Sequence, residues 1–192
     1  TKIGHPGLTK MSQLMPPVIL GGAVYQINVL VGTLLGSFLP EGSVAVLYFA
    51  DRLVQFPLGI FAIAAATAVL PSLSRQAALN DLSALKDTFG YAIRLTLFLT
   101  IPSMAGLIIL RVPIITVLFQ RGEFSPEATL LTAQALLYYS VGLWAFSAER
   151  IVAAIFFALQ DTKTPLTMAA ISIFTNIFLG VVLMKTLAHV GL

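Results

Sequence analysis

The sequence predicts an all-α membrane protein with about five transmembrane helices and a short interfacial helix. Of its 192 residues, 58% are apolar and only 10% are charged, whereas soluble domains carry about 25% charged residues. A soluble fold of this length has too little interior to bury so much apolar surface. The apolar residues also gather into five stretches, each of roughly the length that crosses a bilayer. Composition and segmentation therefore predict the same fold class.

Several other classes of protein are disfavoured by what the chain lacks. It has no cysteine, which excludes disulfides and thiolate metal sites. Its net charge of +3 is scattered, without the Lys/Arg-rich run typical of nucleic-acid binding. The two histidines, His5 and His189, lie near opposite ends, and no catalytic triad, metal-ligand spacing or phosphate-binding glycine loop is present. We therefore expect no enzyme, no cofactor and no nucleic-acid partner.

The five transmembrane helices are expected over residues 15–39, 44–73, 89–110, 126–159 and 165–187. The first carries Pro16 and Pro17 in its first turn, where missing N–H groups do little harm. Residues 40–43 should form a tight turn before the second helix. Pro57 is expected to kink that second helix, because it removes a backbone hydrogen bond.

Prolines and capping residues define the bounds of the later helices. The sequence Arg-Val-Pro at 111–113 is expected to bend or break the third helix before a short apolar tail that ends near Phe119. The fourth begins with Ser125 as N-cap and Pro126 at the first helical position. Because it is too long for one perpendicular span, it should tilt or protrude. Thr-Pro at 164–165 is a similar start for the fifth helix.

The segment 75–87, between the second and third helices, places Ala78, Leu82 and Leu85 on one face. This pattern favours a short helix lying at the membrane interface. An ordinary capped surface linker is the alternative.

The distribution of positive charge predicts the orientation in the membrane. Six Lys or Arg residues lie near the helix ends on one side and three on the other: Lys2, Lys10, Arg75, Lys86, Arg150 and Lys163 against Arg111, Arg121 and Lys185. The positive-inside rule then places the N-terminus and the loops near Asn80 and Lys163 in the cytoplasm. The polar start lacks Met and a signal peptide, and five spans leave the C-terminus outside. We therefore expect part of a longer protein.

The adjacent pair Asp51 and Arg52 is the most informative feature of the chain. These are the only formally charged residues between 44 and 73, and a charge near the bilayer centre costs roughly 2.5–3.5 kcal/mol on insertion scales. Tyr48, Asp51, Arg52 and Gln55 follow one another at i, i+3, i+4 and i+7, so they share one helix face. Such a polar stripe on a membrane helix indicates the wall of a water-filled cavity.

Two roles for Arg52 remain open at this point. It can face the cavity and contact an anion, because the planar guanidinium donates to phosphate oxygens in pairs. It can instead form a structural pair with Asp51, which is itself either a local counter-ion or a proton carrier, or with a neighbouring helix. Gln26 and Asn28 in the first helix do not share a face, so one of them is expected to line the cavity.

The remaining membrane charges are expected to be interfacial anchors. Glu149 and Arg150 lie towards the end of the fourth predicted helix, and Arg94 lies near the start of the third. Long side chains at such positions extend towards the membrane surface at little cost.

Four stretches of the sequence resemble the MurJ (MviN) family of lipid II flippases. They are 49–59 (FADRLVQFPLG), 70–75 (LPSLSR), 118–124 (LFQRGEF) and 161–165 (DTKTP). The resemblance covers nearly the whole chain. It implies the multidrug/oligosaccharidyl-lipid/polysaccharide (MOP) exporter superfamily, whose members have two lobes of six helices. Residues 1–192 would then form part of the C-terminal lobe, with the N-terminal lobe absent.

The resemblance also implies a function, which is transbilayer flipping of lipid II by alternating access for cell-wall synthesis. The partners would be lipid II, an undecaprenyl-pyrophosphate-linked disaccharide-pentapeptide, and the lipids of the bacterial cytoplasmic (inner) membrane. In this family an arginine of the eighth helix lines the central cavity and is needed for flipping, and Arg52 matches it. The candidate substrate-binding residues are therefore Arg52, Asp51, Gln55, Tyr48 and Asn28. Some members carry a carboxylate where Gln55 stands.

Two alternative functions stay open. One is a MOP-type exporter of drugs or of other polyprenyl-linked glycans, and the other is a non-transporting membrane scaffold subunit. A scaffold would have no reason to hold Arg52 in hydrocarbon. Two or three arginines in the first helix of the whole protein would favour a pyrophosphate lipid over a drug.

Overall fold

The computed structural model describes residues 15–16, 19–20, 22–23, 26–27, 29–34, 36–38 and 42–187, without the side chains of 181 and 183–187. The described residues form helices, turns and loops, and they include no strand. They belong to two compact units, one of residues 39–159 and one of residues 1–38 with 160–192. The predicted all-α membrane fold is confirmed, since long apolar helices dominate the described part of the chain.

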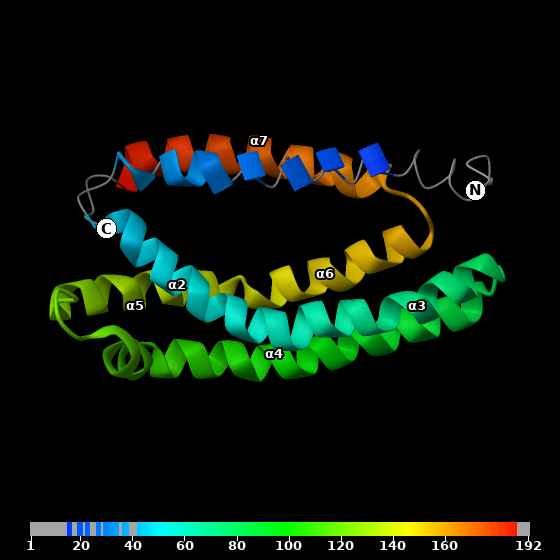
Figure 1. Ribbon diagram of the computed structural model, residues 1–192, viewed down its shortest axis with the longest axis horizontal. Helices are drawn as coiled ribbons and strands as arrows, with labels where there is room; N and C mark the ends of the chain where they lie inside the picture. The colour runs from blue at the N-terminus through cyan, green and yellow to red at the C-terminus, as the bar shows by residue number, and fades with distance from the viewer. Residues whose placement is uncertain are drawn as a thin grey trace, which may run out of the picture. The chain divides into compact units, whose positions relative to one another are not determined.

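The unit of residues 39–159 contains three long helical rods (Figure 1). The first is continuous through α2 (Ser43–Pro57), the π-helix η1 (Leu58–Ile63) and α3 (Ala64–Ala78). The second is α4 (Leu82–Phe119), and the third consists of α5 (Pro126–Val141) and α6 (Leu143–Ala158). The α5 helix packs against α2 and α4, and α6 packs against α3 and α4.

Pro57 does not end the first rod. The chain continues as one apolar helix of 36 residues, Ser43–Ala78, and η1 begins directly after the proline. The kink expected at Pro57 stays a prediction. Proline has no N–H for the carbonyl four residues earlier. The i→i+5 bonding of η1 lies just after the proline, where the Ala64 N–H donates to the Gly59 carbonyl.

The interfacial helix expected over 75–87 does not exist as a separate element. Residues 75–78 are the last turn of α3, and α4 already begins at Leu82. Between them Asn80 takes a left-handed conformation with φ 54°, and the Asp81 carboxylate caps α4 by accepting from the Ala84 N–H at 3.0 Å. The sequence pattern was wrong here because two helix ends meeting at a tight turn also place apolar residues on one side.

The α4 helix runs for 38 residues without a break, through both Pro102 and Pro113. The chain therefore does not break at 111–113, and a bend there stays a prediction. The helix begins seven residues before the predicted residue 89 (89 − 82 = 7). Arg111 donates from Nη1 to the Ile108 carbonyl at 2.6 Å, next to the turn that Pro113 interrupts. Membrane helices tolerate proline when nearby donors satisfy the backbone groups that it frees.

The third rod begins as predicted and then bends where no bend was predicted. Ser125 caps α5 by accepting from the Ala128 N–H at 3.1 Å, with Pro126 at the first position. The expected single helix over 126–159 is instead two helices bent by 43° at Gly142. A Cβ on Gly142 would stand 3.0 Å from the Phe146 ring and 3.4 Å from the Tyr139 carbonyl. A side chain at position 142 would therefore have to displace the Phe146 ring slightly. The tilt or protruding end expected for residues 126–159 stays a prediction.

Two separate apolar clusters hold the three rods together. One joins α2, α4, α5 and the start of α6, and it contains Ala50, Val54, Ile115, Ala133, Leu136 and Leu143. The other joins α3, α4 and α6, and it contains Leu73, Leu85, Ala154 and Ala158. The rings of Phe49, Phe119 and Phe124 also meet, with centroids 4.8 to 6.1 Å apart. These contacts bring the starts of α2 and α5 to the same end as the last turn of α4.

The other unit contains α7 (Lys163–Leu187) and the helical residues described between 15 and 36. The remainder of the helix predicted over 15–39 lies outside the described residues. The α7 helix starts two residues before the predicted 165 (165 − 163 = 2). Its cap is Asp161, which accepts from the Thr164 N–H at 3.0 Å and the Thr164 hydroxyl at 2.5 Å. These hydrogen bonds hold the pKa of Asp161 below its ordinary value.

Candidate functional site

Four polar residues of α2 are joined in one chain of side-chain hydrogen bonds: Tyr48, Arg52, Gln55 and Asp51. Arg52 donates from Nη2 to the Tyr48 hydroxyl at 2.9 Å and from Nη1 to Gln55 Oε1 at 3.2 Å. The same Gln55 donates from Nε2 to the Asp51 carboxylate. The guanidinium carbon also lies 4.8 Å from the centroid of the Tyr48 ring, within the range of a cation–π contact. The helical spacing of these residues therefore produces direct contact.

Gln55 separates the two opposite charges of this cluster. Asp51 and Arg52 are neighbours in sequence, so their side chains leave the helix about 100° apart. No ion pair within 4.0 Å joins them in the described part of the chain, where the one such pair is Arg150 with Glu149 at 3.8 Å. The amide oxygen of Gln55 accepts a hydrogen bond from Arg52, and its amide nitrogen donates one to Asp51. The pair is thus bridged by a neutral group.

Arg52 keeps most of its hydrogen-bonding capacity. A guanidinium carries five N–H donors, and two of them are used within the cluster. Three donors remain for a ligand (5 − 2 = 3). Arg52, Gln55 and Tyr48 are exposed, with Tyr48 at 53%, while Ala50 and Val54 on the opposite face are buried. The cluster therefore lies on the free surface of this unit.

The structure brings together four of the five predicted site residues. Tyr48, Asp51, Arg52 and Gln55 are in contact, whereas Asn28 lies outside the described residues. Gln26 is described and exposed, in the other unit. That the cluster binds a substrate stays a prediction.

Among the other membrane charges, the Arg94 side chain points along its helix. The Arg94 guanidinium lies over Gly90, with Nη1 3.4 Å from the place of a Cβ there. Gly90 is one turn closer to the start of α4, so the side chain extends towards the predicted membrane surface. Glu149 and Arg150 pair with each other and stay exposed. These directions agree with an anchoring role, which also stays a prediction.

Sequence reasoning missed a set of buried hydroxyl groups. Six buried polar residues of the described chain are Thr or Ser: Thr96, Thr100, Thr129, Thr132, Ser140 and Ser147. Their signal in the sequence is a hydroxyl residue at helical spacing inside an apolar stretch, which is common and therefore weak. Within the described residues no group of three or more His, Cys, Asp or Glu could hold a metal ion.

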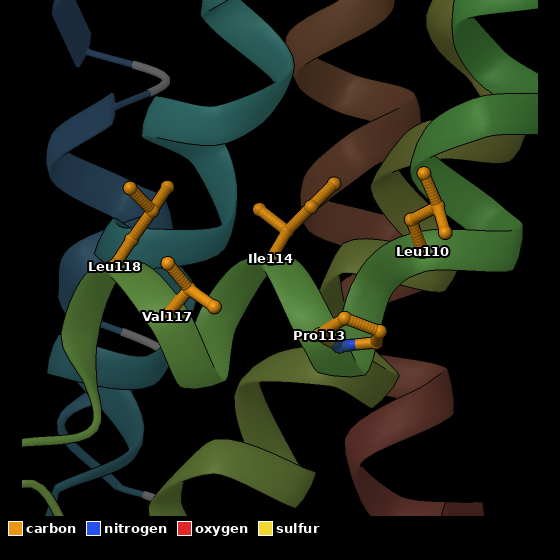
Figure 2. A pocket seen from close by; sticks show the side chains of 5 residues that line it. All are labelled: Leu110, Pro113, Ile114, Val117 and Leu118. Atoms are coloured by element: carbon orange, nitrogen blue, oxygen red, sulfur yellow. The ribbon is translucent and has the colours of Figure 1, made fainter.

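A groove of about 350 Å³ lies on the surface of α4 (Figure 2). Figure 2 shows the five side chains that line it, which are Leu110, Pro113, Ile114, Val117 and Leu118. All five are apolar and come from one helix. The groove offers nothing to recognise a charged group, so the polar cluster on α2 is the better candidate site.

Long apolar helices and a charged, hydrogen-bonded cluster inside one of them define a polytopic membrane protein with a polar site. Residues 2–192 match the family described as lipid II flippase MurJ. The chain belongs to the MurJ family.

Individual relatives agree with this assignment. The chain is 41% identical over 187 residues to a probable lipid II flippase MurJ of Vibrio cholerae, covering 97% of this chain and 36% of the relative. It is 38% identical to the protein of the same description in Rhizobium meliloti, covering 97% and 35%. A solved structure of lipid II flippase MurJ in an inward closed conformation matches with a TM-score of 0.79 at 34% identity, covering 88% of this chain and 35% of that one. The chain therefore spans about a third of the length of these relatives.

Proposed function

We propose that the full-length protein flips lipid II from the inner to the outer leaflet of the bacterial cytoplasmic membrane, and that residues 1–192 supply part of its C-terminal lobe. The names of the relatives support the substrate. The observation in this chain that carries the proposal is the Arg52 cluster on α2. It is a cation inside an apolar helix, held by its neighbours and left with three N–H donors.

The chemistry of the cluster fits a pyrophosphate. A guanidinium stays charged at every physiological pH and donates to phosphate oxygens through parallel N–H groups. Tyr48 and Gln55 restrict its rotation, which reduces the entropy lost when a ligand binds. Asp51 is bridged to Gln55 rather than to Arg52, so the cation keeps its attraction for an anion. Each charge-assisted hydrogen bond to the head group contributes about 1.5–3 kcal/mol.

The transport mechanism that fits this site is alternating access. Two lobes rock about a central cavity, which opens first to one side of the membrane and then to the other. Only the charged head group of a lipid needs a polar path, because the polyprenyl tail can stay in hydrocarbon. Arg52 would hold the pyrophosphate while the sugars and peptide cross beside it.

The test is replacement of Arg52 in the full-length protein. We expect Arg52→Ala to abolish growth of a bacterium depleted of its own flippase, and Arg52→Lys to restore it only in part, because lysine keeps the charge and loses the paired donors. Binding of purified lipid II should weaken by roughly ten- to a hundred-fold in Arg52→Ala, the equivalent of one charge-assisted bond.

Arg94→Ala is the matched control, since it removes another arginine of the same membrane domain. It should support growth at the wild-type level, with membrane abundance checked by blotting. Full rescue by Arg52→Ala at normal abundance would contradict the proposed role. Binding of drugs or of another polyprenyl glycan in place of lipid II would favour a different exporter.

A further inference from the structure

Thr96 and Thr100 form a buried polar pair in the middle of α4. Both side chains are completely buried, with 0% of their surface exposed. They are four residues apart and so lie on one face of the helix, directly after the buried Ala92. Neither Oγ1 atom has a hydrogen-bond partner among the residues that the structure describes.

Two other buried hydroxyls behave differently, whereas Ser140 Oγ likewise has no hydrogen-bond partner among the described residues. Thr132, also 0% exposed, donates to the Ala128 carbonyl at 2.7 Å, and Ser147 donates to the Leu143 carbonyl at 2.7 Å. Bonding to the carbonyl one turn earlier is the usual solution for Thr and Ser in a membrane helix. Thr96 and Thr100 do not use it, although a buried hydroxyl without any partner is destabilising. Their hydroxyls therefore need a different acceptor or donor.

The pair lies between the two apolar clusters. Along α4, Phe89 and Leu85 belong to one cluster and Met104 and Leu107 to the other, and the two threonines fall between them. The elements that pack against α4 include η1 and α6, which carry the small buried residues Ala62 and Ser147.

We propose that a water molecule is bound between Thr96 and Thr100 as a structural part of the region between the two clusters. Side chains four residues apart on a helix have Cβ atoms about 5–6 Å apart, and when both hydroxyls turn towards each other one water can bond to each at about 2.8 Å. A hydroxyl can donate and accept, and a buried water makes two to four hydrogen bonds. The site is polar and enclosed, which are the conditions for a retained water rather than an empty cavity. The proposal of a bound water does not depend on the proposed function.

The experiment compares isosteric variants of the full-length protein in detergent. Thr96→Val, Thr100→Val and the double variant each remove hydroxyls with little change of shape. Thr132→Val is the control, because its hydroxyl is equally buried but bonds to its own helix. We expect each single variant at 96 or 100 to lower the unfolding temperature by roughly 1–3 °C more than the control does.

The double variant distinguishes one water shared by both hydroxyls from two hydroxyls that act independently. Once one substitution has displaced the water, the second should cost little, so the double shift should be clearly smaller than the sum of the single shifts. A high-resolution map of the wild-type protein should also show density between the two Oγ1 atoms, and the double variant should lack it. Three results would overturn the proposal. The first is a higher unfolding temperature in a single variant, and the second is a double-variant shift equal to the sum of the single shifts. The third is a wild-type map in which both hydroxyls bond to helix carbonyls.

Discussion

At the scale of the residue, the orientation of Arg52 depends on its neighbours. The Tyr48 hydroxyl and ring hold one side of the guanidinium and Gln55 holds the other. A free arginine side chain loses about 2 kcal/mol of rotamer entropy when it is fixed. The cluster therefore pre-organises the Arg52 guanidinium for ligand binding.

Replacing Tyr48 tests this preparation. Tyr48→Phe should keep the ring contact and lose the hydrogen bond, whereas Tyr48→Leu should lose both. A cation–π contact at an exposed site contributes about 0.5–1 kcal/mol, so lipid II should bind roughly two- to five-fold more weakly to the Leu variant than to the Phe variant. The measurement is the affinity of each purified full-length variant for lipid II.

Tyr138→Leu is the control for that comparison, since Tyr138 is 70% exposed and lies on α5 outside the cluster. It should bind lipid II like the wild type. Equal affinities of Tyr48→Phe and Tyr48→Leu would mean that the ring does not position Arg52.

At the scale of the element, prolines and glycines have effects that depend on what surrounds them. Pro102 and Pro113 lie inside an unbroken α4, whereas Gly142 bends the third rod by 43°. At Gly142 a Cβ would lie only 3.0 Å from the ring of Phe146. At Gly106, by contrast, a Cβ would meet nothing within 4 Å.

This difference predicts opposite effects of the same substitution. Gly106→Ala should stabilise the protein by up to about 1 kcal/mol, because alanine favours the helix. Gly142→Ala should destabilise it by about 1–3 kcal/mol, as expected when an extra methyl group is forced into a packed site. Thermal or denaturant unfolding of the full-length protein would compare them. Stabilisation by both would show that the bend does not require glycine.

At the scale of the whole molecule, the three rods fix which loops share an end. The starts of α2 and α5 meet through Phe49 and Phe124, while the α3–α4 turn lies with the end of α6 through Leu85 and Ala158. Gly42 and Gly122, with φ of 90° and 60°, form the turns at the first of these ends. The charge count assigns that end to the outside of the cell.

Cysteine labelling of the full-length protein tests this orientation. Cysteines at Ser43 and Glu123 should react with an impermeant thiol reagent in intact cells, and those at Ser83 and Lys163 should react only after permeabilisation. Residues 1–192 contain no cysteine, so this region contributes no background labelling. The reverse pattern would refute the positive-inside assignment.

The amino-acid sequence by itself determined the fold class, the Ser125 start of α5 and the polar face of α2. These features depend on composition and on spacing within one helix, and both are local properties that the sequence states directly. The contacts among Tyr48, Asp51, Arg52 and Gln55 follow from the same spacing.

Only the tertiary structure decided how the helices continue, bend and pack. The α4 helix passes through Pro113 without a break, and a membrane helix tolerates proline where its surroundings satisfy the freed backbone groups. The burial of Thr96 and Thr100 depends on the elements from other parts of the chain that pack against α4. Such contacts join residues far apart in sequence, and no pattern within a single helix contains them.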